Sequence, residues 1–222
     1  KSDLLQLASA DTQQITALER KGVFEIIEKA GSRLESFEVT TPVSSIILTE
    51  PQQTAFSHIK QGFENHNVTL LHGVTSSGKT EIYIRLIDEV INSGKQALFL
   101  LPEIALTTQI IQKLRAVFGD DIGIYHSRYS DNERIEIWQK TKQSEFKIII
   151  GARSALLLPF AHLGLIIVDE EHDASYKQQD PAPRYHARDT ALYLAHQNKA
   201  NILLGSATPS IESFYNCQIG KY

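Results

Sequence analysis

Residues 73–80 read Gly73-Val74-Thr75-Ser76-Ser77-Gly78-Lys79-Thr80, a match to the phosphate-binding pattern G-x-x-x-x-G-K-[ST] at every fixed position. The stretch follows an apolar run at 68–72, typical of a strand, and precedes residues 80–92, whose apolar side chains recur with helical spacing. In this context backbone N–H groups and the amino end of the helix face a bound phosphate. The sequence therefore predicts a nucleotide site formed by this whole loop, with Lys79 on the β- and γ-phosphates and the Thr80 hydroxyl on Mg²⁺.

Apolar runs and amphipathic stretches alternate from this loop to the end of the chain. Strands are predicted at 68–72, 96–101, 122–125, 146–150, 165–168 and 201–204, and helices at 80–92, 105–118, 131–142 and 187–197. Continuous apolar strands that alternate with helices are typical of a parallel sheet covered on both faces, so the predicted fold class is α/β. Ligands of such sheets bind at the carboxyl ends of the strands, where the polar motifs of this chain also fall.

An acidic motif, Asp169-Glu170-Glu171-His172, follows the predicted strand 165–168. Asp169 is predicted to bind Mg²⁺ directly or through water, and Glu170 to accept the proton of an attacking water. Alone, an acidic strand end is equally well a solvated turn, but the phosphate loop earlier in the chain favours a catalytic interpretation. His172 is placed with Lys79, Asp169 and Glu170 among the predicted catalytic residues, in the role of coupling hydrolysis to movement, although a lone histidine is more often structural.

The composition excludes several classes of protein. The 22 Lys and Arg residues against 26 Asp and Glu, a net charge of −4, argue against a generally basic surface for nucleic acid, but not against a local basic patch. No apolar run approaches the roughly 18 residues of a membrane span, and no signal peptide is evident, so we expect a cytoplasmic protein without a membrane partner. The single cysteine, Cys217, excludes a disulfide framework or a cysteine-rich zinc module within these 222 residues. Because the chain begins at Lys1 and contains no Met, we expect a fragment of a longer protein, or a sequence from which modified methionines are omitted.

The first forty residues follow a different pattern. A helix ending at Lys21-Gly22 is predicted, followed by two strands at 23–27 and 34–39. Two interpretations stay open for residues 1–40: the C-terminal part of a winged-helix DNA-binding domain, or a generic helix-and-hairpin appendage. Residues 41–48 are the predicted linker, and residues 49–222 the nucleotide-binding domain.

The motifs together resemble helicase superfamily 2 and, within it, the bacterial replication-restart helicases. The segments that carry the resemblance are Pro51-Gln52-Gln53, Leu100–Thr107, His126-Ser127 with Glu133-Arg134 and Trp138, Gly151–Ala155, Asp169–His172, Ser175–Gln178, Pro183–Asp189 and Gly205–Ser210. The resemblance runs from about Thr49 to the end of the chain. Ser76, beside Ser77, is a departure, because many members of the family carry glycine there.

The resemblance implies the first RecA-like lobe of a helicase that uses ATP and Mg²⁺, with the second lobe and a zinc-binding segment outside this chain. It also implies 3′→5′ unwinding of DNA at stalled forks and binding to branched and single-stranded DNA. The implied partners are single-stranded DNA-binding protein and the primosome proteins that load the replicative helicase, in the bacterial cytoplasm at the nucleoid. Because the second lobe supplies arginines to the γ-phosphate, we expect this chain alone to bind nucleotide weakly and not to unwind DNA.

The resemblance further implies roles for individual residues. Gln52 and Gln53 would read adenine. The residues implied to contact DNA are Pro102, Glu103, Thr107, Arg153 and Ser154. The residues implied to couple DNA occupancy to the acidic motif are Tyr176, Lys177, Arg184, Tyr185, Ser206 and Thr208.

Other interpretations of these segments and of the whole chain stay open. Glu103 and Thr107-Thr108 alone read as an ordinary helix start. The aromatic and basic residues Tyr176, Lys177, Arg184, Tyr185 and His186 suit stacking on bases, but Tyr185 with His186 also read as the packing of a long loop onto the sheet. A small-molecule kinase would need a phosphoacceptor site and a lid, and neither is apparent in the sequence. A non-catalytic DNA-binding module is a third class, in which the winged helix would make the contacts.

Overall fold

The computed structural model describes residues 18, 21–23, 34, 38–103, 109–126 and 129–222. The chain divides into two compact units, residues 1–33 and 34–222, and the second is described below. The predicted winged-helix segment lies almost entirely outside the described residues, as does Thr107.

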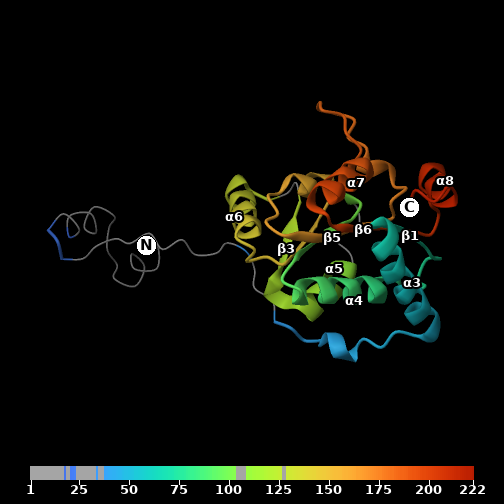
Figure 1. The fold of residues 1–222 in the computed structure, drawn as a ribbon. Helices are drawn as coiled ribbons and strands as arrows, with labels where there is room; N and C mark the ends of the chain where they lie inside the picture. The colour runs from blue at the N-terminus through green and yellow to red at the C-terminus, as the bar shows by residue number, and fades with distance from the viewer. Residues whose placement is uncertain (1–17, 19–20, 24–33, 35–37, 104–108, 127–128) are drawn as a thin grey trace. The chain divides into compact units, whose positions relative to one another are not determined.

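Six parallel strands form one sheet in the second unit (Figure 1). The strands are β1 (Val68–His72), β2 (Gln96–Leu100), β3 (Ile122–Tyr125), β4 (Ile148–Gly151), β5 (Leu163–Asp169) and β6 (Asn201–Ser206). Their order across the sheet is β1-β6-β5-β2-β4-β3, and every neighbouring pair is parallel. The six strands predicted from the sequence and the α/β fold class are confirmed.

Helices cover both faces of this sheet. The helices are α3 (Glu50–His66), α4 (Lys79–Asn92), α5 (Gln109–Phe118), α6 (Asp131–Lys142), α7 (Ala187–Asn198) and α8 (Ile211–Gln218). Helices α3, α4 and α5 lie on one face, and α6 and α7 lie on the other (Figure 1). The sequence did not predict α3, although Thr49 and Gln52 form a capping box at its start and Pro51 lies in its first turn. Helix α8 was also missed; its N-cap is Ser210, whose side chain accepts a hydrogen bond from the Ser213 N–H.

The central strands β2 and β5 are largely apolar because both of their faces are buried. In β5, Leu165 and Ile167 contribute to the core on the α4 side, whereas Ile166 and Val168 contribute to the core on the α7 side. Each of these four side chains has 0% exposure. Burial of this kind supplies most of the stabilisation of such a fold, at about 25 cal/mol per Å² of apolar surface.

The predicted linker, residues 41–48, packs against this lobe. The N–H groups of Thr40 and Thr41 both donate to the carbonyl of Ala116 in α5, at 2.8 and 2.9 Å. Val43, Ile46 and Leu48 pack against the core on the α4 side. Within the described residues, this stretch is therefore attached to the lobe along its length.

The strand order brings the predicted motifs together at one edge of the sheet. β6 lies between β1 and β5, with His72 opposite Ser206 and Asp169 opposite Gly205. The phosphate loop after β1, the acidic motif after β5 and the segment after β6 are therefore neighbours. β2 and β4 end at the same edge, because all the strands are parallel.

Candidate nucleotide-binding site

The phosphate loop makes a tight turn between β1 and α4. Gly78 has φ +82°, a conformation that favours glycine, and a Cβ there would lie 1.9 Å from Gln52 Nε2 and displace that amide. Ser76 also has a positive φ, of 62°, which is costly for a residue with a side chain. Lys79 Nζ donates to the carbonyl of Gly73 at 2.8 Å and lies 3.9 Å from Glu170 Oε1.

A pocket of about 300 Å³ joins the loop to the acidic motif. Its lining residues are Thr75, Ser76, Gly78, Lys79, Thr80, Glu81, Asp169 and Glu170. The structure thus brings together the predicted phosphate-binding lysine, the predicted Mg²⁺ hydroxyl and the two predicted catalytic carboxylates. Val74, also predicted to bind nucleotide, is 72% exposed and does not line this pocket.

Gln52 connects helix α3 to the phosphate loop. Its Oε1 accepts hydrogen bonds from the N–H and the hydroxyl of Thr49, at 2.8 and 3.0 Å. Its Nε2 donates to the carbonyl of Gly78 at 3.3 Å. The neighbouring Gln53 is exposed. Gln52 thus lies beside the loop, and its amide supports the loop's backbone.

Asp169 ends β5 with its carboxylate held by a tyrosine. Tyr83 of α4 donates its hydroxyl proton to Asp169 Oδ1 over 2.9 Å. Burial raises the pKa of Asp169 and the nearby Glu170 carboxylate adds to the rise, while the Tyr83 hydrogen bond and Lys79 oppose it. The pKa of Tyr83 is raised well above its ordinary value by burial and by Asp169, so its hydroxyl stays a proton donor. The sequence did not single out Tyr83.

His172 links the acidic motif to the segment after β6. Its Nδ1 lies 2.8 Å from Ser206 Oγ and 3.7 Å from Glu170 Oε2, and its Nε2 lies 3.2 Å from Thr208 Oγ1. The Thr208 N–H donates to Ser206 Oγ at 3.0 Å. Residues that the sequence assigned to catalysis and to coupling therefore form one hydrogen-bonded group.

Glu171 points away from the pocket into a buried polar cluster that the sequence did not reveal. Its carboxylate has 0% exposure and pairs with Arg188 of α7 at 3.1 Å. It also accepts hydrogen bonds from the Ser210 N–H at 2.6 Å and the Ser213 hydroxyl at 2.8 Å. Burial alone would raise the pKa of Glu171, but these bonds outweigh it and hold the pKa below its ordinary value. The acidic motif is thereby tied to both α7 and α8.

Of the residues predicted to contact DNA, the four that the structure describes lie at the same edge of the sheet as the pocket. Pro102 is buried after β2 and Glu103 beside it is exposed. Ser154 is partly exposed in the short 3₁₀ turn that follows β4. Arg153 in the same turn donates from Nη1 to the carbonyls of Ser175 and Lys177, both at 3.1 Å. The Nη1 group of Arg153 therefore binds the backbone of the loop that follows the acidic motif.

The loop between residues 173 and 186 is anchored at its base and projects beside α7 (Figure 1). Tyr176 is 1% exposed, and its hydroxyl lies 2.7 Å from the carbonyl of Asp169 and 3.1 Å from that of Leu100. Lys177 pairs with His186 as an antiparallel bridge, and its Nζ donates to the carbonyl of Arg184 at 2.8 Å. Tyr176 is therefore a core side chain that touches the acidic motif through its backbone, and it is not free to stack on a base.

Tyr185 and Arg184 differ in their surroundings. Tyr185 is half-buried and packs against the core on the α7 side, as the loop-packing alternative expected. Arg184 is exposed near the tip of the loop.

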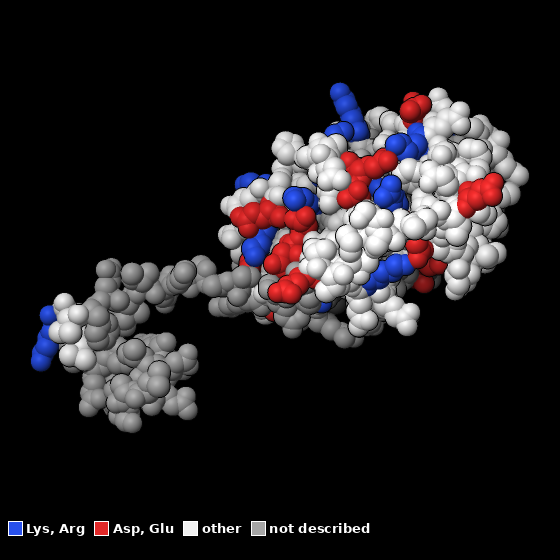
Figure 2. Space-filling model, turned by 90° about the horizontal axis from the view of Figure 1, so that it is seen from below, with Lys and Arg blue, Asp and Glu red and all other residues white. Residues whose placement is uncertain are grey.

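The surface of the lobe carries both signs of charge. On the face drawn in Figure 2, the described Asp and Glu side chains lie among Lys and Arg side chains, and no single sign covers the face. Within the described residues, no helix has the length and apolarity needed to cross a bilayer.

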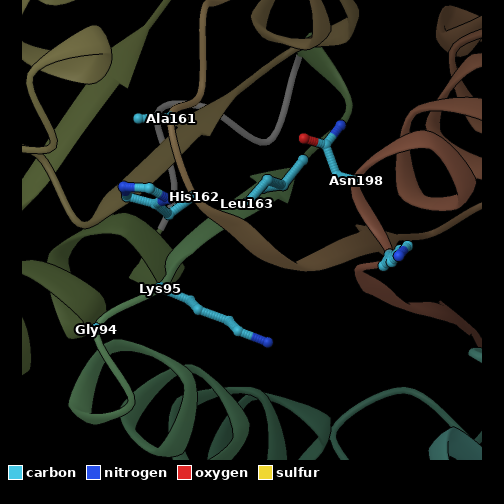
Figure 3. Close-up of a pocket in the computed structure, with 7 residues that line it drawn as sticks. Gly94, Lys95, Ala161, His162, Leu163 and Asn198 are labelled. Atoms are coloured by element: carbon cyan, nitrogen blue, oxygen red, sulfur yellow. The ribbon is translucent and has the colours of Figure 1, made fainter.

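A second pocket, of about 520 Å³, lies at the turns that precede β2, β5 and β6, at the opposite edge of the sheet. Figure 3 shows the extended side chain of Lys95, with His162 and Asn198 among the other residues that line this pocket. The pocket shares no residue with the one beside the phosphate loop.

Comparisons with known proteins agree with this geometry. Residues 49–216 match the family described as DEAD/DEAH box helicase. The chain belongs to this family. The matched region begins at Thr49, the first residue of the capping box that holds Gln52 against the phosphate loop.

Replication restart proteins are among the curated relatives of this chain. The chain is 42% identical to the replication restart protein PriA of Chlamydia pneumoniae, covering 100% of the chain and 30% of that protein. It is 45% identical to PriA of Haemophilus influenzae, covering 93% of the chain and 29% of that protein. The predicted resemblance to the replication-restart helicases is confirmed, and the chain spans less than a third of the length of these relatives.

Solved structures show the fold. RecG bound to a three-way DNA junction superposes with a TM-score of 0.57 at 22% identity, over 79% of this chain and 23% of that one. The helicase domain of Pyrococcus furiosus Hef superposes with a TM-score of 0.56 at 18% identity, over 84% of this chain and 38% of that one. The described lobe thus has the fold of RecA-like helicase lobes.

Proposed function

We propose that residues 49–222 are the ATP-binding lobe of an ATP-dependent 3′→5′ DNA helicase that acts in replication restart. The observation that carries this proposal is the single pocket lined by Lys79, Thr80, Asp169 and Glu170. Its residue types are those that bind a nucleoside triphosphate with Mg²⁺ and activate a water.

The residues present fit a magnesium–nucleotide complex. Within the described part of the chain, no three His, Cys, Asp or Glu side chains gather into a metal site. Mg²⁺ suits such a site, because it is usually held by one or two protein oxygens together with phosphates and water. Thr80 and Asp169 would hold the ion, which would neutralise developing charge on the phosphates. Lys79 binds phosphate, and Glu170 takes the proton of the attacking water.

The proposed DNA path follows the edge where β2 and β4 end. Glu103, Ser154 and the loop anchored by Arg153 line this edge beside the pocket. Phosphate contacts of this kind would give binding without sequence preference. RecG, whose lobe has the same fold, was solved on branched DNA, and branched and single-stranded DNA are the proposed substrates.

The remaining parts of the proposal concern the longer protein, because the chain matches only about 30% of the curated relatives. A second motor lobe, a zinc-binding segment and the rest of a winged helix that includes residues 1–40 would lie outside this chain. Single-stranded DNA-binding protein and helicase-loading primosome proteins are the proposed partners, in the bacterial cytoplasm at the nucleoid. The 222-residue chain alone is expected to bind nucleotide weakly and to leave forked DNA intact.

The test is Lys79→Ala in the full-length protein. ATP hydrolysis stimulated by DNA should be lost while fork binding is kept, because Lys79 faces phosphate and not DNA. Lys95→Ala is the matched control, since Lys95 lies at the opposite edge of the sheet (Figure 3). Hydrolysis that persists in Lys79→Ala, or that fails equally in Lys95→Ala, would refute the assignment of this loop.

A further inference from the structure

Tyr83 occupies a fixed position beneath the end of β5. It lies one helical turn after Lys79 in α4, so the two side chains leave the same side of the helix. The residue has 0% exposure, and its ring packs edge-on against Phe99 of β2 with centroids 5.5 Å apart. A ring held in this way has little freedom to swing its hydroxyl elsewhere.

The Tyr83 hydroxyl is directed at one oxygen of Asp169. It donates to Oδ1 over 2.9 Å, across 86 positions of sequence. The second carboxylate oxygen, Oδ2, takes no part in this bond. The hydrogen bond thus selects one orientation of the carboxylate of Asp169, the last residue of β5. The next residue, Glu170, has φ +48°.

Gly205 provides the space for this contact. It lies directly opposite Asp169 in the β5–β6 ladder. A Cβ at Gly205 would lie 1.9 Å from the Tyr83 hydroxyl oxygen, 3.0 Å from its Cζ and 3.3 Å from Asp169 Oδ1. Any side chain at this position would displace the hydroxyl. The contact therefore depends on α4, β5 and β6 together.

We propose that Tyr83 is a positioning residue that holds the Asp169 carboxylate toward the Mg²⁺ site, and that Gly205 is small in order to admit its hydroxyl. This inference rests on the proposed function, because it concerns the ion that Asp169 would bind there. Partners that orient metal ligands change metal affinity by about 10- to 100-fold when they are removed, without touching the metal.

The test compares variants of the full-length protein by the binding of a fluorescent ADP analogue at increasing Mg²⁺ concentration. Tyr83→Phe removes only the hydroxyl. The Mg²⁺ concentration at half-maximal binding should rise by about tenfold, while nucleotide affinity without Mg²⁺ stays unchanged. Gly205→Ala should raise the same concentration in the wild-type background, and by much less in the Tyr83→Phe background, because the hydroxyl it displaces is already gone.

Thr141→Val is the matched control. Thr141 is also fully buried, and its hydroxyl donates to the carbonyl of Ile137 at 2.7 Å in α6, far from the pocket in the sequence and on the other face of the sheet. Thr141→Val, like Tyr83→Phe, removes one buried hydroxyl and is expected to cost a similar amount of stability. The melting temperatures of the two variants will measure that cost. The positioning role is overturned if Tyr83→Phe and Thr141→Val show the same Mg²⁺ dependence as the wild type.

The two levels of the proposal fail in different ways. Wild-type protein that binds the ADP analogue with no response to Mg²⁺ would overturn the proposed function and this inference together. A normal Mg²⁺ response in the wild type that Tyr83→Phe leaves unaltered would overturn the inference alone.

Discussion

The carboxylate of Glu171 and the guanidinium group of Arg188 lie 3.1 Å apart inside the lobe, the first with 0% and the second with 9% exposure. The pair joins the end of the acidic motif to helix α7. A buried pair stabilises little against apolar replacements, but the loss of one partner leaves the other charge buried and uncompensated.

Arg188→Met is therefore expected to lower the free energy of unfolding by about 3 kcal/mol, which urea denaturation at neutral pH will measure. Lys60→Ala is the control, because Lys60 and Glu89 form an exposed pair whose loss should cost less than about 1 kcal/mol. Equal losses in the two variants would contradict the role of burial.

The pH dependence of stability follows from the same carboxylate. The pKa of Glu171 is lowered from the ordinary value of 4.5, so its charge stabilises the fold above that pH, and the stabilisation is lost as the pH falls through the lower folded value. The free energy of unfolding of the wild type should decline below about pH 4.5, and less steeply in Arg188→Met. Parallel curves for the two proteins would contradict this prediction.

Asp169→Asn should stabilise the lobe while abolishing hydrolysis. Burial raises the pKa of Asp169 above its ordinary value of 3.8, so the ionised form that prevails at neutral pH is the unfavourable one in the folded state. Asparagine removes this charge and still accepts the Tyr83 hydrogen bond, with an expected gain of about 1 kcal/mol. Thermal melts at pH 7 without nucleotide will measure it. Glu145→Gln, which removes an exposed carboxylate, should leave the melting temperature unchanged.

Ser76→Gly is expected to stabilise the protein by about 0.5 kcal/mol and to keep nucleotide binding. Ser76 has φ +62°, a conformation that costs a residue with a side chain about 1–2 kcal/mol, of which the greater freedom of glycine in the unfolded chain cancels part. Gly78→Ala makes the opposite change, since its Cβ would strike Gln52, and should abolish nucleotide binding. Melting temperature and ADP-analogue affinity separate the two.

Gln52→Glu should weaken nucleotide binding with little change in stability. A carboxylate can still cap α3 through Thr49, but it cannot donate to the carbonyl of Gly78. Loss of that donor leaves the loop without its support, at a cost of about 1 kcal/mol, or roughly fivefold in affinity. Gln61→Glu, an exposed change in the same helix, should leave affinity unaltered, and a Gln52→Glu protein of normal affinity would show that the amide is dispensable.

The strands and the phosphate loop could be predicted because their signals are local. Continuous apolar runs and a fixed eight-residue pattern can be recognised without knowing which segments lie side by side in the fold. The contacts that tune the site could not, because they depend on which strands lie side by side. Tyr83 reaches Asp169 only because β6 places a glycine between them, and Glu171 turns inward only because α7 brings Arg188 beneath it.

The two aromatic residues of the loop after the acidic motif illustrate the same limit. Tyr176 and Tyr185 occur in a stretch whose composition suits base stacking, yet composition does not reveal which side of the loop faces the sheet. Tyr176 lies in the core with its hydroxyl near two backbone carbonyls. Sequence could identify the loop, but not the direction of its side chains.

His172→Ala is expected to separate hydrolysis from unwinding in the full-length protein. His172 contacts Ser206 and Thr208, and no described hydrogen bond joins it to Lys79 or Thr80, so it lies between the acidic motif and the end of β6. Single residues in such networks carry up to about 2 kcal/mol of coupling, so unwinding should fall by about tenfold while DNA-stimulated hydrolysis changes little.

Thr208→Val removes one of the same contacts and should act in the same direction, and His196→Ala, an exposed change in α7, should do neither. Parallel assays of phosphate release and fork unwinding measure the ratio of the two activities. Because His172 also lies 3.7 Å from Glu170, a direct catalytic role predicts a different result, in which hydrolysis falls as steeply as unwinding. That outcome would move His172 from coupling to chemistry.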